Sequence, residues 1–507
     1  MRPGTLLRLA VAGTRTDTVR VVLTGLSAAL ATLAGLAALT VLAIPTPPAT
    51  DDNLNRWSEQ YTNELLREPG LRGGVAFALL LLCVPVLALA GQCARLGAPA
   101  RDRRLAALRL AGATPGQVTR IAVVETGLAS LLGTLTGLAV HLVGRRVLHR
   151  PDPGGRLPLP TDVRPTLAVI VAVVVGLPLV AALASAVLLR RVTTSPFGVV
   201  RRVRTRAPWP WPGLLILLGL AMFAAVRPVG LWYERRYEEP PLWLLPTLLI
   251  GGGLAAMVGV VAGTGWISHA AGRVLHRYAR RPAALLAARR LTADPWAGSR
   301  TFAALLAALI FGAGAAGFRA NFLAEAELHR RTGGGFGAAE DFYLRALDLV
   351  GLAVAVAVAI AAGGLLVAVV EGVTTRRRAY AALVATGVPR ATVGRSLLWQ
   401  SLVPAVPAIA LALTVGYLLV RGVYRAPSGG GYPEEICDAG ERLCSDPLTR
   451  AQHVRTEWVP KVTVTPDVPW EQLAWFAAGG LAAMLVTVGV GLLFLRASTT
   501  VEELRTT

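Results

Sequence analysis

The sequence predicts an all-α polytopic membrane protein with about ten transmembrane helices, arranged as two parallel four-helix repeats and a joining helical hairpin. Its 507 residues are 54% hydrophobic and only 16% charged, which is too apolar for a soluble chain of this length. The apolar residues gather in runs of about 20, the length that crosses a bilayer as a helix. One short basic segment also occurs twice, which indicates an internal duplication.

Ten apolar runs are candidate membrane spans. The first is expected to be an uncleaved helix, because it is longer than the roughly 7 to 15 residues of a signal peptide's apolar region. The fifth run is the shortest. In chain order the runs are 21–44, 74–92, 121–143, 166–189, 212–226, 242–264, 301–318, 347–370, 398–420 and 472–495.

Charge predicts the orientation of these spans. If the N-terminus is cytoplasmic, the segments on that side hold the excess of basic over acidic residues, whereas bases and acids balance on the other side. Basic loops tend to stay in the cytoplasm, so we expect a multi-pass protein of the plasma membrane with both termini cytoplasmic. The net charge of +21 is divided among short loops beside apolar runs. This favours contact with membrane lipids and argues against a nucleic-acid partner.

The duplicated segment occupies residues 103–120 and 378–395. Aligned without a gap, both copies share a leading Arg, Ala-Ala-Leu, a central Gly, a Val and a closing Arg. Six predicted helices separate equivalent points, and an even number gives both copies the same orientation, as parallel repeats require. We therefore expect a first four-helix unit at 1–205, a joining hairpin at 206–270 and a second four-helix unit at 271–507. Each unit is expected to begin with a basic amphipathic lead-in helix that lies at the cytoplasmic membrane interface, at 6–20 and 283–300.

The repeats resemble the permeases of the FtsX/MacB-like ABC superfamily. The resemblance rests on the basic run, Ala-Ala-Leu, Gly, a short turn and Arg, followed by Glu125 in one copy and Gln400 in the other, and it covers nearly the whole chain. It implies a non-catalytic membrane subunit that works with a separate ABC ATP-binding subunit, in two copies, so that this chain binds no cofactor itself. Single-chain members carry a large outer domain, which the predicted outer segments 45–72 and 319–345 are too short to form.

The resemblance also implies where the ATPase binds. In such permeases the cytoplasmic segment between the second and third helices of a unit contacts the ATPase, and here Gly112 and Gly387 fall at its helix-turn position. Asp102 interrupts the arginines of the first copy, so the two ATPase copies are expected to bind with unequal affinity. The docking residues are Arg103, Arg104, Leu108, Gly112 and Val118 in the first copy, and Arg376, Arg377, Arg378, Leu383, Gly387 and Val393 in the second.

The chain has no nucleotide-binding loop of its own. The P-loop pattern G-x-x-x-x-G-K-[ST] needs a lysine that reaches the phosphates, and the only lysine, Lys461, lies in an outer loop. The six histidines are scattered, without the paired Cys/His spacing of a zinc site. An enzyme is therefore not expected, and ATP, if it drives the protein, must be bound by a partner chain.

Polar side chains in or at the edges of the spans are further candidates. Glu125 and Gln400 lie near predicted helix starts, where a helix N-terminus favours negative charge, and Asp348 lies near an outer helix end. A structural role is favoured over a transport role for all three. In the outer loop 421–470, Cys437 and Cys444 are spaced for a disulfide in an oxidising compartment, with free thiols as the alternative.

Two other patterns predict packing. Glycines at 133 and 137, and again at 259 and 263, are spaced so that helices can approach closely in lipid, with chance spacing in a chain of 53 glycines as the alternative. In the first outer loop, Leu54, Trp57, Tyr61 and Leu65 recur at helical spacing, which predicts an amphipathic helix. It is expected to pack over the helix bundle, with contact to a lipid-like substrate on the outer membrane face as the alternative.

The sequence therefore favours a permease subunit that exports or extracts an amphipathic or lipid-associated substrate, coupled to ATP hydrolysis by its partner. One alternative is a mechanical transmitter that regulates a protein partner on the outer face without transport. Another is an ATP-independent secondary transporter, which predicts buried acids near the bilayer midplane.

Overall fold

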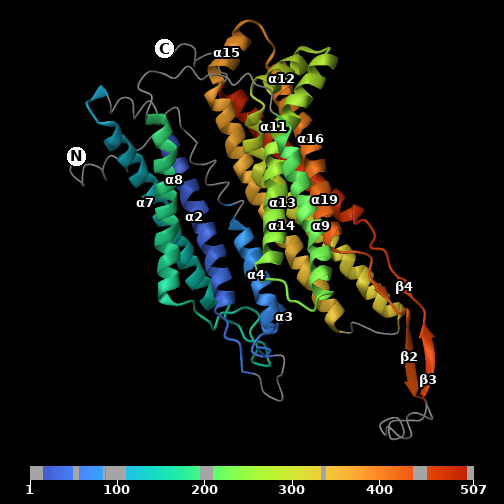
Figure 1. Ribbon diagram of the computed structural model, residues 1–507. Coiled ribbons are helices and arrows are strands. Elements are labelled where there is room, and N and C mark those ends of the chain that lie inside the picture. The colour runs from blue at the N-terminus through green and yellow to red at the C-terminus, as the bar shows by residue number, and fades with distance from the viewer. Residues whose placement is uncertain are drawn as a thin grey trace.

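Long helices running side by side form most of the molecule (Figure 1). The computed structural model describes residues 15–48, 56–83, 86, 110–193, 209–241, 243–332, 338–437 and 454–498. Within these ranges, nine helices are long and apolar enough to cross a membrane. The predicted all-α polytopic fold is therefore confirmed. The tenth predicted span, 74–92, is described only in part, where α4 (Pro69–Leu81) forms.

Two sets of helices repeat the same neighbours. In the first set, α2 (Arg15–Leu42) packs on α4 and on α7 (Pro115–Val147), and α7 packs on α8 (Leu167–Thr193). In the second set, α13 (Trp296–Arg331) packs on α14 (Ala338–Thr375) and on α16 (Arg390–Val423), and α16 packs on α19 (Trp470–Ser498). This shared arrangement fits the predicted parallel repeats. The domain boundaries themselves stay a prediction.

A hairpin of helices lies between the two sets in the sequence and packs on the second. It consists of α9 (Trp211–Glu234), the short α10 (Leu244–Pro246), a π-helical turn η1 (Thr247–Gly251) and α11 (Gly252–Tyr278). Val260 of α11 joins Leu309 of α13, Leu365 of α14 and Ala408 of α16 in the main buried core. The first set meets the second where Leu23 of α2 packs against Val367 of α14.

Glycines allow the closest helix contacts, as predicted. A Cβ added at Gly133 in α7 would lie 2.1 Å from the carbonyl oxygen of Gly25 in α2. One added at Gly137 would lie 2.7 Å from that of Ala29, and one at Gly259 would lie 2.8 Å from that of Pro212 in α9. These backbones touch because no side chain separates them.

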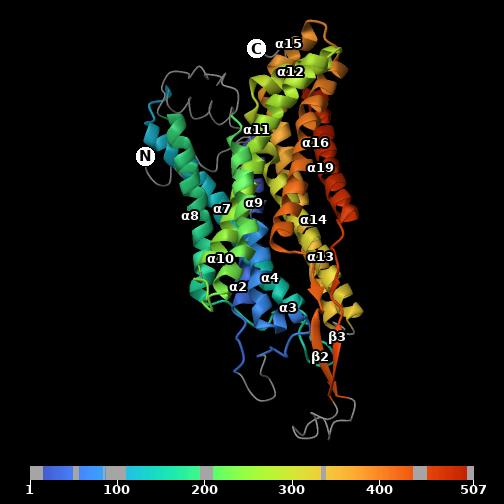
Figure 2. The ribbon, with the colours of Figure 1, turned by 45° about the vertical axis from the view of Figure 1, so that its right-hand side comes forward.

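The two ends of the molecule differ. Figures 1 and 2 show α12 (Pro282–Ala293) and α15 (Arg377–Ala385) together at one end, called the α15 end below. The opposite end holds α3 (Glu64–Arg67) and the antiparallel pair of β2 (Tyr432–Cys437) and β3 (Val454–Val459), in which Tyr432 faces Val459. It is called the hairpin end below, after this β2–β3 pair and not after the helical hairpin α9–α11. Beside this pair, β1 (Ser428–Gly429) pairs with β4 (Val462–Thr463).

The structure corrects three expectations about the segments outside the spans. First, α13 continues to Arg331 and α14 begins at Ala338, so most of the predicted outer segment 319–345 is helical. Second, the lead-in 283–300 is not one helix, because α12 ends at Ala293 and α13 already begins at Trp296. Third, the strands of the loop 421–470 were not predicted.

The amphipathic helix predicted in the first outer loop is wrong over residues 56–63, which are not helical, and only its end lies in a helix, α3. Tyr61 is instead fully buried and forms a β-bridge with Leu157 of the second outer loop. Its hydroxyl donates a hydrogen bond to Asp162 Oδ1 at 2.8 Å, and Gln60 Nε2 donates to Asp162 Oδ2 at 2.9 Å. Burial, more than the adjacent Asp162, raises the pKa of Tyr61 to about 12.

Candidate functional site

The second predicted docking segment is a short helix that ends in a glycine turn. After α15, Gly387 has φ +92°, a left-handed conformation that side chains disfavour. Its N–H donates to the carbonyl of Val384, and the N–H of Val388 donates to that of Leu383. These two bonds form a Schellman motif, which satisfies carbonyls at the end of the helix. The chain is thereby redirected into α16, which begins at Arg390.

The described part of the first segment has the same turn. Gly112 also has φ +92°, and Leu110 beside it is 91% exposed. Thr114 then starts α7 with a capping box: Gln117 N–H donates to Thr114 Oγ1, and Thr114 N–H donates to Gln117 Oε1. The other docking residues of this copy, Arg103, Arg104 and Leu108, lie outside the described residues.

A buried valine follows each glycine at the same distance in the sequence. Val118 and Val393 are each 2% exposed. Val393 packs with Val373 and Tyr380 in a small apolar cluster that Val388 also joins. In the second copy this valine joins α16 to α14 and α15, while Leu110 and Gly387 stay exposed. Figure 1 places the start of α7 at the same end of the molecule as α15.

The helix α12 attaches α15 to the helices that cross the membrane. Arg290 Nη1 donates a hydrogen bond to the Tyr380 hydroxyl, with the guanidinium carbon 5.3 Å from the ring centroid. Arg376 Nη2 lies 3.8 Å from Asp294 Oδ2 in an ion pair at the surface. Side chains of Arg377 and Arg378 lie outside the described part, although their backbone opens α15.

The sequence did not point to Arg290 and Asp294, because α12 was expected to lie on lipid. In the structure its apolar face is buried against α11 and α16. That face consists of small side chains with helical spacing, which favours protein contact over lipid contact. The buried residues are Ala283, Ala284, Ala287, Ala288 and Leu291.

The three polar candidates in the spans are Glu125, Gln400 and Asp348. They lie away from the predicted docking segments, and none lies in the first turn of its helix. Glu125 is 7% exposed and lies about 15 Å beyond the first residue of α7, with Gln400 at the same place in α16. The partial positive charge at a helix N-terminus acts only within the first turn. It therefore does not stabilise Glu125, which lies nearly three turns into α7. Asp348 of α14 pairs with Arg319 of α13, which supports its structural reading.

The predicted disulfide is not described. Cys437 ends strand β2, opposite Val454 of β3, and Cys444 lies outside the described residues. The bond between them stays a prediction. Within the described ranges, no group of three or more His, Cys, Asp or Glu side chains is placed to hold a metal ion.

Comparison with known proteins gives one family match. The family described as FtsX-like permease C-terminal matches residues 73–197 and 351–502, which together make up more than half of the chain. The two matches contain the two glycine turns and equivalent helices of the two sets. No curated protein and no solved structure matches the chain.

Proposed function

Because the chain belongs to the FtsX-like permease family, we propose that it is the membrane subunit of an ABC transporter whose ATP is hydrolysed by a separate subunit. Members of this family typically pair with an ABC ATPase. We assign the α15 end and both termini to the cytoplasm. The excess of basic residues on that side supports this orientation.

The observation that carries the proposal is the pair of glycine turns. Gly112 and Gly387 have the same φ of +92°, and each is followed by a valine that is 2% exposed. Left-handed glycines end many helices, but here each is also followed six residues later by a buried valine, within segments that repeat 275 residues apart in the sequence. We propose that each turn docks one ATPase copy.

The contacts of α15 suggest how movement passes to the membrane. An ATPase that shifts α15 also displaces Tyr380 and Arg376, and through them Arg290 and Asp294 of α12. Because α12 packs on α11 and α16, the displacement reaches two long helices directly. In this scheme Arg290 and Asp294 are positioning residues and do not themselves contact ATP.

We propose an amphipathic or lipid-associated substrate, exported or extracted from the bilayer. The apolar character of the spans supports this class. Each of the nine described spans contains an 18-residue window with at most two charged residues. A hydrophilic substrate needs polar groups along its path, which these windows supply poorly.

A second candidate function is mechanical transmission to a protein on the outer face. It is favoured by the β2–β3 pair, which extends beyond the helices at the hairpin end (Figure 2). Tyr432 and Trp458 are both more than half exposed on this pair, and exposed aromatic side chains are common in protein interfaces. Substrate movement in reconstituted vesicles separates the two functions, because a transmitter moves none.

Co-purification tests the docking proposal. The chain is expressed with its ABC ATPase, and Arg376, Arg377 and Arg378 are all replaced by Ala. We expect the ATPase to be lost from the purified complex. A matched variant replaces three arginines at the hairpin end, Arg150, Arg156 and Arg425, and should retain it. Equal retention by both variants would contradict docking at α15.

A further inference from the structure

The loop that joins α7 to α8 at the hairpin end is rich in basic residues. Residues 144–166 contain five arginines and only two aspartates. An excess of bases is typical of cytoplasmic loops, and the α15 end lies opposite, so this loop departs from the charge balance of its side. Bases do not outnumber acids in the other segments that join predicted spans on this side, which are 45–72, 227–241, 319–345 and 421–470.

Two of these arginines come together at the turn before α8. Arg145 Nη2, near the end of α7, donates a hydrogen bond of 2.7 Å to the carbonyl of Thr161. Arg164 lies close enough for the two positive charges to repel each other. His149 Nδ1 is also hydrogen-bonded to the Thr161 hydroxyl, at 2.8 Å. The fold thus gathers cationic groups at one turn, an arrangement that an anion would stabilise.

The nearby carboxylate of Asp162 is already hydrogen-bonded to other residues. Its Oδ1 accepts from the Tyr61 hydroxyl, and its Oδ2 accepts from Gln60 Nε2. Asp162 attracts Arg145 electrostatically, but within the described ranges no ion pair joins it to Arg145 or Arg164. A guanidinium has five N–H donors. Most of the donors of these two arginines therefore remain for an acceptor from outside the chain.

The helix α8 indicates where the membrane surface lies. Its apolar span, Leu167–Ala186, has 20 residues and is therefore about 30 Å long, which matches the hydrocarbon core of a bilayer. Only 6% of the most apolar part of this span is buried inside the protein, so α8 faces lipid along most of its length. Leu167 then lies at the edge of the hydrocarbon core, and Arg164, three residues earlier, lies among the head groups.

Helix packing brings Arg145 to the same level. Thr134 Oγ1 of α7 donates a hydrogen bond of 3.3 Å to the carbonyl of Val174 in α8, and the two helices run in opposite directions. Since Val174 is seven residues from Leu167, α7 passes the level of Leu167 seven residues after Thr134, at His141. Arg145 follows His141 by four residues, about 6 Å, and therefore also lies among the head groups.

Exposed apolar side chains flank the two arginines. Val143 and Val147 on α7 are 59% and 56% exposed, and Leu167 at the start of α8 is 76% exposed. Apolar side chains at this level can contact acyl chains, while the guanidinium groups lie at the level of phosphates. A surface with both properties suits a lipid better than a free ion.

We propose that Arg145 and Arg164 bind the head group of an anionic phospholipid in the leaflet at the hairpin end. Guanidinium groups suit phosphate because their paired N–H donors match its oxygens. With Arg146 alongside, three arginines outnumber Asp162, so a lipid with a net negative charge is favoured over a zwitterionic one. Binding here needs neither an ATPase nor transport, so the site can fail or hold whatever the proposed function does.

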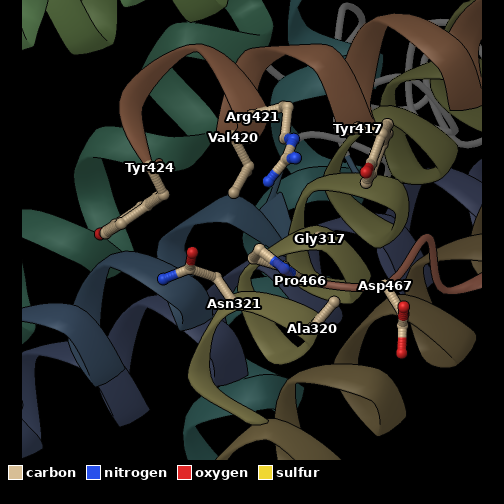
Figure 3. A pocket seen from close by; sticks show the side chains of 9 residues that line it. All are labelled: Gly317, Ala320, Asn321, Tyr417, Val420, Arg421, Tyr424, Pro466 and Asp467. Carbon is tan, nitrogen blue, oxygen red and sulfur yellow. The ribbon is translucent and has the colours of Figure 1, made fainter. Parts of the chain in front are cut away.

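Arg421, another exposed arginine at the hairpin end, provides a comparison. It lines a small hollow between α13 and α16 (Figure 3), whose enclosed space has room for about one water molecule. Among the described residues that line this hollow, Arg421 is the only arginine, and Asp467 is an acid. A head group finds no second guanidinium there, so Arg421→Gln is a matched control.

Photo-crosslinking in vesicles tests the proposal. The full chain carries a photoreactive residue at Leu167 or at Trp470, which begins the apolar span of α19 as Leu167 begins that of α8. The vesicles contain equal amounts of phosphatidylglycerol and phosphatidylcholine with identical acyl chains, and mass spectrometry identifies the attached lipid. At Leu167 we expect phosphatidylglycerol about fivefold more often, the effect of about one net positive charge at a membrane surface. At Trp470 we expect no such preference.

Substitutions connect the preference to the arginines. Arg164→Gln should reduce the preference at Leu167 about fivefold, to near equality, whereas Arg164→Lys keeps the charge and should retain most of it. Arg421→Gln should leave it unchanged. Because Arg164 is exposed, these results do not depend on whether a change at the partly buried Arg145 would disturb the loop.

Several results would overturn the proposal. They are equal attachment of the two lipids at Leu167, the same preference at Trp470 as at Leu167, or an equal loss in Arg421→Gln and Arg164→Gln. Soluble glycerol phosphate, added at constant ionic strength, should not compete. If it removed the preference at Leu167, the site would take a free anion, and the membrane source would be contradicted.

Discussion

At the scale of single residues, the two glycines at φ +92° show most clearly how the sequence determines the candidate site. A glycine is the default residue where a helix must end in a left-handed turn. The sequence repeat predicted that Gly112 and Gly387 are equivalent, and the backbone gives both the same conformation. Side-chain contacts such as Arg290 with Tyr380 were beyond prediction, because they join segments whose relative position only the packed helices determine.

Replacing Gly387 by Ala should destabilise the turn. Space is not the reason, because nothing lies within 4 Å of the added Cβ. The cost is the left-handed backbone, about 1 kcal/mol. Gly363→Ala is the control, since that glycine lies inside α14 with open space around it, and alanine favours a helix. Melting in detergent should show a lower midpoint for Gly387→Ala only, and an equal decrease in both variants would contradict this account.

The contact between Arg290 and Tyr380 should be measurable as a coupling energy. Tyr380→Phe keeps the ring and removes the hydroxyl that accepts from Arg290. In a double-mutant cycle with Arg290→Gln, the two changes should together cost about 1 kcal/mol less than their sum. Chemical unfolding of the four chains gives this number. Strict additivity would show that α12 and α15 are not joined through this pair.

Tyr61 predicts a dependence of stability on pH. Its pKa in the folded chain is about 12, above the ordinary 10.0. The pKa of Tyr61 is higher in the folded chain than in the unfolded chain. Its neutral hydroxyl therefore stabilises the fold fully below the unfolded pKa, and this stabilisation is lost as the pH rises from the unfolded pKa to the folded pKa. Melting points at about pH 9 and about pH 11 should therefore differ less for Tyr61→Phe than for the unaltered chain. Identical differences would show that Tyr61 ionises freely.

At the scale of elements, apolar runs predicted where helices cross the membrane but not where they end. The helix α13 continues through Glu327, Arg330 and Arg331. Because these residues are charged, the apolar pattern ended before them and did not indicate that the helix extends into water. Ion pairs of Glu327 with both arginines support that extension. The strands β2 and β3 were missed because 16 residues separate them in the sequence, far more than the short turn by which a hairpin is recognised.

The α2–α7 contact provides a prediction at this scale. Gly133→Ala would place a methyl group 2.1 Å from the carbonyl oxygen of Gly25, so the helices must separate. Such overpacking costs about 1 to 3 kcal/mol. Gly144→Ala, in the same helix with open space around it, should cost nothing. Thermal unfolding of both variants measures this difference. Equal stability of Gly133→Ala and Gly144→Ala would mean that α2 and α7 are not in contact at Gly133.

At the scale of the whole molecule, duplication predicted the arrangement well. Both sets of helices repeat the same neighbours, and the family match also falls on two segments. The sequence did not show that the hairpin α9–α11 packs on the second set, or that α12 packs on α11 and α16. These additions give the second glycine turn a support, through Arg290 and Asp294, that the first lacks within the described residues. We therefore expect the two docking sites to differ in strength.

Site-specific photo-crosslinking tests the central claim that both glycine turns contact the ATPase. A photoreactive residue is placed at Leu110, beside Gly112, at Ala385, beside Gly387, and at the fully exposed Tyr237 near the hairpin end. We predict that Leu110 and Ala385 each crosslink to the ATPase subunit and that Tyr237 does not. Crosslinking from Tyr237, or from neither turn, would contradict docking at the α15 end.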